Sequence, residues 1–462
     1  MQSLNYKVST LENGIRVITE TVNHVQFMSL GIWVGVGSRY ESEQEWGITH
    51  FIEHMLFKGT EKRTAEQISG AIDAVGGQLN AFTSKENTCY YVKTLTEHFP
   101  LAVDVLSDMF LHSKFDNEEI AKEREVIIEE IKMYEDTPDD QVHDMLSANL
   151  WPAHPLGRAI LGTEESIAAF DHDALKAYMK QYYTGSNIVI SAVGNISHEQ
   201  VVAAIQQTLG QIPKGEKNQY LRAGTTAAGV HCNYKEIAQS QICVAMPGVA
   251  KEDARLFPLS ILNTYLGGGM SARLVKKIRE EEGLAYSVYS YNGSYSDTGA
   301  FVIAVGTRPE NCQQVVDIIL EELEDIRQKG ITQQELEKAF SQLKGSLFMG
   351  LETVNSRMNK LGRSLLAYDR VITPEENVAE LAKVTVADVK QLAEEIFAKD
   401  KLEITVLPKG FLRIHRSYIV SVSQIKTFNS TSLTLMNGKE LPVGRKYLPN
   451  LKTAFQTPEN VI

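Results

Sequence analysis

The run HFIEH at residues 50–54 has the residue types and the spacing of a metal-dependent hydrolytic site. On an α-helix, residues four apart lie on one face, so His50 and His54 can present ring nitrogens to a single ion about 2 Å away. Apolar residues recur around them at helical spacing, which predicts a helix that ends near Gly59. The run therefore indicates a zinc hydrolase site, although a helix with an ordinary solvated face would show the same letters.

A catalytic zinc usually has three protein ligands and one open position, so a further donor is expected on another element. The candidate is a glutamate-rich helix within residues 116–131. On such a helix Glu123 and Glu130 lie two turns apart on one face, while Glu129 points about a quarter turn away. Because glutamate-rich helices are commonly only a solvated face, the spacing alone does not choose among these carboxylates.

Three runs, HFIEHMLFKGT, GGQLNAFTSKENTCYYV and EREVIIEEI, resemble the insulinase/pitrilysin family of inverted-motif zinc peptidases. The closest likeness is to its mitochondrial-processing-peptidase-like subfamily, and it covers most of the chain. The resemblance implies one zinc ion, held by His50, His54 and Glu130. It also implies that Glu53 is the general base rather than a ligand, and that Glu123 lies behind the ligands and is needed for full activity.

Two further segments gain roles from this resemblance. Arg279 and Tyr286 match the spacing of an arginine and a tyrosine that hold the substrate carbonyl, a role that suits a guanidinium and a phenol. The glycines at 267–269 lack the spacing of a nucleotide-binding loop.

The segment at 79–92, with Asn80 and Ala81, is expected to be an edge strand near the zinc that pairs with an extended peptide. A plain sheet edge is the alternative.

Alternating strands followed by amphipathic helices predict an α+β fold, in which each of two halves has a mainly antiparallel sheet with helices packed on one side. An internal repeat supports the two halves, since residues 115–131 resemble 331–347 and the strand at 28–37 resembles 240–249. We therefore expect a zinc-binding catalytic half at 1–214, a homologous half without metal that supplies substrate contacts at 215–408, and a small β-rich fragment at 409–462.

The second half lacks the donors of the first. Ala339 and Ser346 take the places of Glu123 and Glu130. Leucine and asparagine side chains fall roughly where the HFIEH run was, at Leu259, Leu262 and Asn263.

Composition limits the environment and the partners. The chain has 462 residues, of which 43% are hydrophobic, and no apolar run or signal peptide that would suggest a membrane span or export. Its 4 cysteines form no CxxC pair, so a cytoplasmic protein with reduced thiols is expected. Residues 1–408 hold 38 Lys+Arg against 56 Asp+Glu, which would attract basic, presequence-like peptides. The resemblance implies a homodimer, or a heterodimer with a related subunit, that encloses unfolded peptides.

The tail departs from the rest of the chain. Residues 409–462 carry 8 Lys+Arg and 2 Asp+Glu, and they resemble the second half of a LytTR-type DNA-binding domain. Asn437-Gly438 between alternating strands predicts a hairpin. The strands that should complete the sheet of such a domain are missing, so nucleic-acid binding is not expected. An appended fragment, from a gene fusion or a sequence-assembly error, is favoured. Basic residues that could contact phosphates are Arg413, His415, Arg416, Arg445 and Lys446.

Three functional classes compete on this evidence. The first is a zinc endopeptidase that cleaves unfolded or presequence-like peptides. The second is a non-catalytic partner subunit, a class in which the zinc residues are typically lost, whereas this chain keeps them. The third is a DNA-binding regulator acting through the tail, against which the incompleteness of the fragment argues.

Overall fold

The computed structural model describes residues 5–233, 235, 237–407, 411–415, 417–421, 424–436 and 438–454. The predictions for Arg416 and Asn437 lie outside these residues. The chain forms two compact units. Unit 1 comprises Met1–Met133, Ala153–Arg222 and Leu343–Ala382, and unit 2 comprises Tyr134–Pro152, Ala223–Gln342 and Lys383–Ile462. The sequence-based division at 214 and 408 describes the internal repeat, and it stays a prediction. The compact units are divided differently, because each contains segments from both sides of residue 214.

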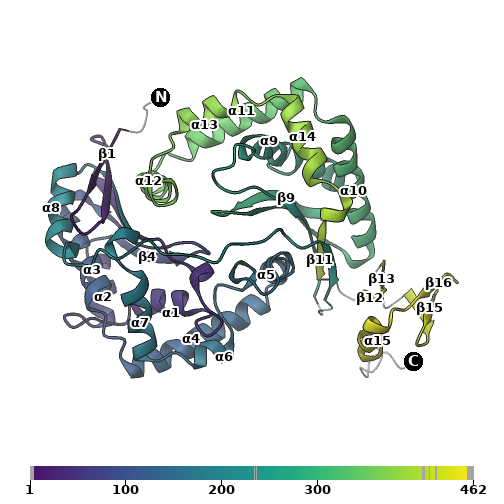
Figure 1. Cartoon of the computed structure of the whole chain (residues 1–462), viewed down its shortest axis with the longest axis horizontal. Helices are drawn as coiled ribbons and strands as arrows, with labels where there is room; N and C mark the ends of the chain where they lie inside the picture. The colour runs from purple at the N-terminus through teal and green to yellow at the C-terminus, as the bar shows by residue number, and fades with distance from the viewer. Residues whose placement is uncertain are drawn as a thin grey trace. The chain divides into compact units, whose positions relative to one another are not determined.

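Unit 1 is built on a six-stranded sheet (Figure 1). The strand order is β1-β2-β6-β3-β5-β4, which leaves β4 at an edge, and the pairs are antiparallel except for the parallel pair β2 and β6. The strands are β1 (Tyr6–Thr10), β2 (Arg16–Thr21), β3 (Phe27–Val34), β4 (Gln78–Thr83), β5 (Thr88–Leu95) and β6 (Ile188–Gly194).

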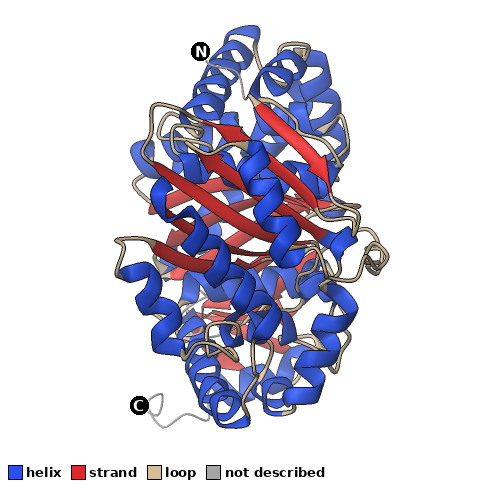
Figure 2. Cartoon of the chain, turned by 90° about the vertical axis from the view of Figure 1, so that its left-hand side faces the viewer, coloured by secondary structure: helices blue, strands red, loops and turns tan. Residues whose placement is uncertain are grey.

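Helices cover both faces of this sheet, and Figure 2 shows helices lying across the strands. One face packs on α3 and α8, and the other on α12. The helices of unit 1 are α1 (Ile48–Met55), α2 (Ala65–Asp73), α3 (Phe99–His112), α6 (Glu164–Ala168), α7 (His172–Tyr182), α8 (His198–Leu209), α12 (Val354–Tyr368), α13 (Pro374–Leu381) and most of α4 (Asn117–Glu135).

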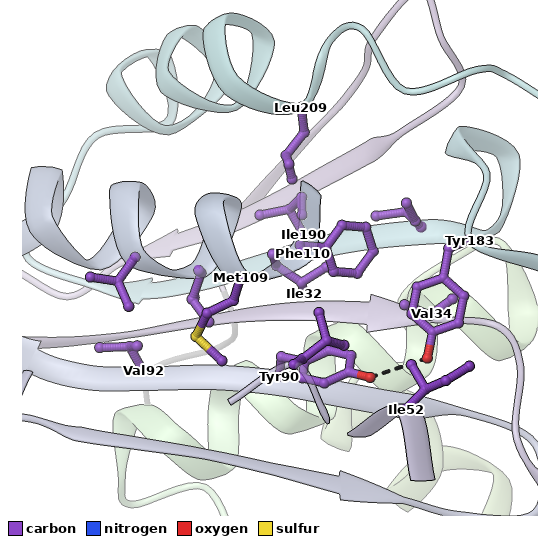
Figure 3. Packing of buried hydrophobic residues seen from close by; sticks show 14 of the residues in the cluster. Ile32, Val34, Ile52, Tyr90, Val92, Met109, Phe110, Tyr183, Ile190 and Leu209 are labelled. Atoms are coloured by element: carbon purple, nitrogen blue, oxygen red, sulfur yellow. Dashed lines mark hydrogen bonds between the residues drawn. The ribbon is translucent and has the colours of Figure 1, made fainter. Parts of the chain in front are cut away.

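The alternation of side chains along β3 explains the two faces. Ile32 and Val34 enter the larger core, where Phe110 of α3 and Ile52 of α1 pack (Figure 3). Trp33 points to the opposite face and packs in a second cluster with residues of α12. The helix that carries the HFIEH run is thus fixed to the sheet by its apolar side.

Unit 2 repeats this plan with a five-stranded sheet in the order β7-β11-β8-β10-β9. Its parallel pair is β7 and β11, and the other pairs are antiparallel. The strands are β7 (Gly229–Cys232), β8 (Ser240–Pro247), β9 (Ala285–Ser294), β10 (Gly299–Thr307) and β11 (Glu403–Leu407). The helices are α5 (Pro138–Leu150), α9 (Leu256–Leu266), the π-helix η5 (Val275–Glu281), α10 (Cys312–Lys329), α14 (Val386–Ile396) and the first part of α11 (Gln333–Met349).

The two sheets confirm the predicted α+β fold with two related halves. From β2 to β4 in unit 1 and from β7 to β9 in unit 2, the strands follow the same order and the same pairing directions. The expectation of helices on one side only is incomplete, because each sheet has a helix on its second face that comes from the other part of the sequence. That helix is α12 for unit 1 and α5 for unit 2.

The C-terminal segment forms two small antiparallel sheets and one helix, which confirms a β-rich fragment. Its apolar side chains, including Leu412, Ile414 and Leu451, form a cluster of their own. Strands β15 and β16 pair antiparallel across the predicted turn, where Gly438 has a φ of 83°. The elements are β12 (Phe411–His415), β13 (Tyr418–Ser421), β14 (Ile425–Phe428), β15 (Ser432–Leu435), β16 (Glu440–Pro442) and α15 (Leu448–Ala454).

Among the described residues, none of the helices combines the length and the apolar character that crossing a membrane requires.

Candidate active site

Helix α1 begins at a tightly fixed corner. Gly47, its N-terminal cap, has a φ of 94°, and a Cβ there would lie 2.7 Å from the carbonyl oxygen of Leu161, so the position requires glycine. The buried carboxylate of Glu41 accepts hydrogen bonds from the backbone N–H groups of Gly47 and Thr49, at 2.8 and 3.0 Å. Burial raises the pKa of Glu41 to about 7 despite these bonds. The helix ends at Met55, one turn earlier than the expected stop near Gly59.

The two histidines of α1 and Glu130 of α4 converge. One potential ligand atom from each of His50, His54 and Glu130 lies within 4.8 Å of the others. Oε2 of Glu130 lies 3.8 Å from Nε2 of His50 and 3.6 Å from Nε2 of His54. His50 is buried, and His54 and Glu130 are partly exposed, so the group can be reached from solvent.

The donor set fits a zinc ion. Tetrahedral ligands with bonds of about 2.0–2.1 Å stand a little over 3 Å apart, and the observed separations are somewhat wider than that. These separations are too long for hydrogen bonds between the imidazoles and the carboxylate. Two imidazole nitrogens and one carboxylate oxygen also leave a fourth position, as catalytic zinc requires. Burial and the neighbouring His54 lower the pKa of His50 to about 3, which keeps this ring neutral and able to donate a lone pair.

Glu123 lies behind His54. Its Oε1 is 2.7 Å from Nδ1 of His54, so this nitrogen carries the hydrogen and donates it, which leaves Nε2 for a metal. Its Oε2 is 2.5 Å from Nζ of Lys58. Burial raises the pKa of Glu123, but the bonds from His54 and Lys58 outweigh that effect, and the pKa is lowered. The carboxylate is therefore ionised and orients the ring.

Glu53 lies on α1 between the two histidines, but it does not belong to the metal-holding group. Thr83 of β4 donates a hydrogen bond from its hydroxyl to Oε2 of Glu53. Burial raises the pKa of Glu53, with the bond from Thr83 and the charge of His54 acting in the opposite direction. A carboxylate with a raised pKa beside a metal-holding group is a candidate proton acceptor.

Strand β4 is the edge strand that the sequence predicted. It pairs only with β5 among the described strands, and it contacts α1. Asn80 is exposed and Ala81 is half-buried, and both lie in the middle of the strand. The free edge therefore runs beside the helix that carries the histidines.

Arg279 and Tyr286 lie in unit 2 and are brought together there. The guanidinium of Arg279, at the end of η5, lies 4.8 Å from the ring centroid of Tyr286 at the start of β9. Tyr286 is 81% exposed, so its hydroxyl is available to a ligand. Their action on a substrate stays a prediction.

The counterpart positions of unit 2 cannot form a comparable group. Leu259 and Leu262 on α9 are fully buried in the core. Asn263 accepts a hydrogen bond from the hydroxyl of Ser290. Among the described residues of the whole chain, the group of His50, His54 and Glu130 is the one set of such side chains able to hold a metal ion.

Sequence reasoning missed three residues that support this site, namely Glu41, Lys58 and Thr83. Lys58 stands four residues after His54 but beyond the end of α1 at Met55, and Thr83 comes from a strand, so the helical spacing within α1 indicates neither. Glu41 lies six residues before the helix cap it holds. An acidic residue shortly before a helix is a weak signal, because many surface loops contain one.

Two imidazoles and a carboxylate with an open position, flanked by a second carboxylate outside the group, define a zinc-dependent peptide hydrolase site. Residues 16–164 match the family model of insulinase (peptidase family M16), and residues 169–343 match that of the peptidase M16 inactive domain. Residues 398–456 match the LytTr DNA-binding domain.

Similar proteins of known sequence are named zinc proteases. A Bacillus subtilis protein named zinc protease YmxG is 43% identical over 401 residues, covering 87% of this chain and 98% of the relative. A zinc protease of Streptomyces coelicolor is 40% identical over 399 residues, covering 85% of this chain and 87% of the relative. A crystal structure of a Helicobacter pylori protease shares the fold, with a TM-score of 0.81 at 21% identity over 88% of this chain and 100% of that one.

The chain belongs to the insulinase (M16) family, and it is a zinc metallopeptidase. The family resemblance stated from the three sequence runs is confirmed, as is the likeness of the tail to LytTR domains.

Proposed function

We propose that the protein is a zinc endopeptidase that cleaves unfolded or presequence-like peptides, with Glu53 as the general base. One observation carries the proposal. Glu53 lies on the same helix as His50 and His54, yet it stands outside the metal-holding group, and its carboxyl has a raised pKa. A carboxylate that is not a ligand, but is adjacent to one, is free to move protons.

Each residue of the metal-holding group and its neighbours has a separate role in the proposed reaction. His50, His54 and Glu130 would hold one zinc ion, which when bound would polarise a water molecule and the substrate carbonyl. Glu53 accepts a proton from the attacking water and gives it to the leaving amine. Glu123 keeps the proton of His54 on Nδ1, so that Nε2 stays directed at the metal.

The substrate is proposed to bind as an extended strand. The free edge of β4, around Asn80 and Ala81, offers backbone groups to a peptide without requiring a particular side chain. Only an unfolded segment can present its own backbone in this way. The net charge of residues 1–408, with 38 Lys+Arg against 56 Asp+Glu, favours basic peptides.

Arg279 and Tyr286 are proposed to bind the substrate carbonyl oxygen as negative charge develops on it. The guanidinium lies 4.8 Å from the ring centroid of the exposed Tyr286, and a guanidinium and a phenol are both groups that can donate hydrogen bonds to an oxyanion. We further propose a cytoplasmic protein that acts as a homodimer or with a related subunit. We also propose that the LytTR-like tail does not bind nucleic acid.

The test is cleavage of a mixed library of unfolded basic peptides, with and without chelator and added zinc, read by mass spectrometry. The wild-type protein should cut in a zinc-dependent manner, and a library of acidic peptides of equal length should be cut less. Glu53→Gln should keep the zinc content of the wild type and lose turnover. Loss of zinc in that variant would show that Glu53 is a ligand and that the assignment of the base is wrong.

Two variants on α4 test the third ligand. Glu130→Gln should lower zinc content, whereas Glu129→Gln should not, because the carboxylate of Glu129 pairs with Lys132 on the surface. A zinc-loaded wild-type protein that cuts none of the peptides would contradict the proposal and favour the non-catalytic partner subunit instead.

A further inference from the structure

A side-chain hydrogen bond joins the edge strand to the metal-binding helix, since the hydroxyl of Thr83 donates to Oε2 of Glu53. Side chains alternate along β4, so Leu79, Ala81 and Thr83 share the face that packs toward the core and α1. Thr83 is the last residue of the strand. Its hydroxyl is thus the polar end of an otherwise apolar row.

We propose that Thr83 is a positioning residue for Glu53: it holds Oε2 and leaves Oε1 to meet the attacking water. This inference rests on the proposed role of Glu53 as general base. A glutamate side chain has three rotatable bonds, so without a fixed partner it would spread over several rotamers. A charge-assisted hydrogen bond is strong enough to select one of them.

The position of Thr83 is itself fixed by the hairpin that follows it. The N–H of Ser84 donates to the carbonyl of Asn87 at 2.8 Å, which closes the turn between β4 and β5. The N–H of Arg39 donates to the carbonyl of Lys85 at 2.8 Å and ties this turn to the segment after β3.

A buried ion pair strengthens the same attachment. The guanidinium of Arg39 lies 2.7 Å from the carboxylate of Glu86, with both side chains almost fully buried. The close approach at Gly37 leaves no room for a side chain, because a Cβ there would lie 2.1 Å from the carbonyl oxygen of Ser84. The end of β4 is therefore a rigid support.

Threonine is suited to this role because its branched Cβ restricts χ1, so the hydroxyl has few alternative directions. The consequence is that the strand proposed to bind the peptide backbone also directs the base. Substrate position and proton transfer then depend on one element.

The experiment compares Thr83→Val, which removes the hydroxyl at nearly constant shape, with Thr83→Ser, which keeps it. Thr88→Val is the matched control. Thr88 lies directly across the hairpin from Thr83, and its buried hydroxyl donates to the carbonyl of Val36 at 3.0 Å rather than to Glu53. For each variant, kcat, KM, the zinc dissociation constant and the urea midpoint of unfolding are measured.

Thr83→Val should lower kcat about 10- to 100-fold, the effect of losing one hydrogen bond to a charged group. KM and zinc affinity should stay at the wild-type values. Thr83→Ser should restore most of kcat, and Thr88→Val should change the urea midpoint without changing kcat. In a cycle of Thr83→Val with Glu53→Ala, the changes in urea midpoint should be non-additive, which reports the contact without any activity.

The alternative outcomes separate the two proposals. If Thr83→Val keeps the wild-type kcat while Glu53→Gln is inactive, the role of Thr83 is wrong and the general base stands. Equal losses of kcat in Thr83→Val and Thr88→Val, loss of zinc in Thr83→Val, or additive changes in the cycle would also overturn the inference. If the zinc-loaded wild type cuts no peptide, the proposed function fails and the role of Thr83 fails with it.

Discussion

Replacing Glu123 by glutamine should weaken zinc binding although no ligand is changed. The two carboxylate oxygens of Glu123 each face a donor, Nδ1–H of His54 at 2.7 Å and the ammonium of Lys58 at 2.5 Å. An amide has one acceptor oxygen and one NH₂ group, so in Glu123→Gln one of the two donors faces another donor. The side chain is almost fully buried, so water cannot easily replace the lost partner.

The expected magnitude follows from these contacts. Loss of one hydrogen bond to a charged group costs about 1.5–3 kcal/mol, and part of this cost falls on the orientation of His54. Carboxylates that orient a metal-bound imidazole typically change metal affinity by about 10- to 100-fold. We therefore expect the zinc dissociation constant of Glu123→Gln to rise about 10- to 100-fold.

Competition with a chromophoric chelator measures this constant at fixed pH. The matched control is Glu119→Gln, one turn earlier on α4, where the carboxylate pairs with the exposed Lys122. The control should bind zinc as the wild type does. Lys58→Met should also weaken zinc binding, and the double variant with Glu123→Gln should lose less than the sum of the two. A Glu123→Gln protein with wild-type zinc affinity would show that Glu123 does not act through His54.

Three further predictions concern stability, each measured by urea unfolding. Glu86→Ala should destabilise the protein by about 3–5 kcal/mol, because the buried guanidinium of Arg39 would lose the carboxylate of Glu86, and a loss below about 1 kcal/mol would contradict this account. Gly47→Ala should cost more than about 2 kcal/mol, since a φ of 94° strains alanine and its Cβ meets a backbone oxygen, and an unchanged urea midpoint would refute it. Burial raises the pKa of Glu403 to about 7 against the opposing effects of Thr405 and Arg413, so the folded state holds its proton more tightly than the unfolded state does. The contribution of Glu403 to stability should therefore fall as pH rises from about 4.5 to about 7, by at most about 3 kcal/mol, and level off above. Glu403→Gln should show a fall smaller than that of the wild type by about this amount, because the similarly raised pKa of Glu41 still contributes.

The sequence predicted the parts of the site that lie on regular helices. The four-residue spacing of His50 and His54 and the seven-residue spacing of Glu123 and Glu130 predict shared helix faces, while the choice of these two glutamates came from the family resemblance. The structure places all four side chains together. Thr83 could not be found in this way. Its contact depends on how a hairpin 30 residues away in sequence from Glu53 folds back onto α1.

The sequence pattern also did not predict which helices belong to which compact unit. Internal similarity locates repeated strands and helices, but it does not show which sheet face a connecting helix will cover. Helix α5 follows α4 in the chain, yet it packs on the sheet of unit 2, and α12 follows α11, yet it packs on the sheet of unit 1. The burial of apolar surface decides which sheet the helix covers. Trp33 of β3 and Met358 of α12 are buried in one cluster, on a face of the unit 1 sheet that would otherwise be exposed.

The repeat explains how one half can lose its metal ligands and keep its fold. Helices α1 and α9 occupy corresponding places beside their sheets, but α1 turns imidazoles toward α4, whereas α9 buries Leu259 and Leu262 in the core. Leucine at these positions adds buried apolar surface. Unit 2 therefore gains stabilising packing at the places where unit 1 has polar side chains. The described part of unit 2 thus keeps the fold without a metal-holding group, and it carries exposed groups such as Tyr286.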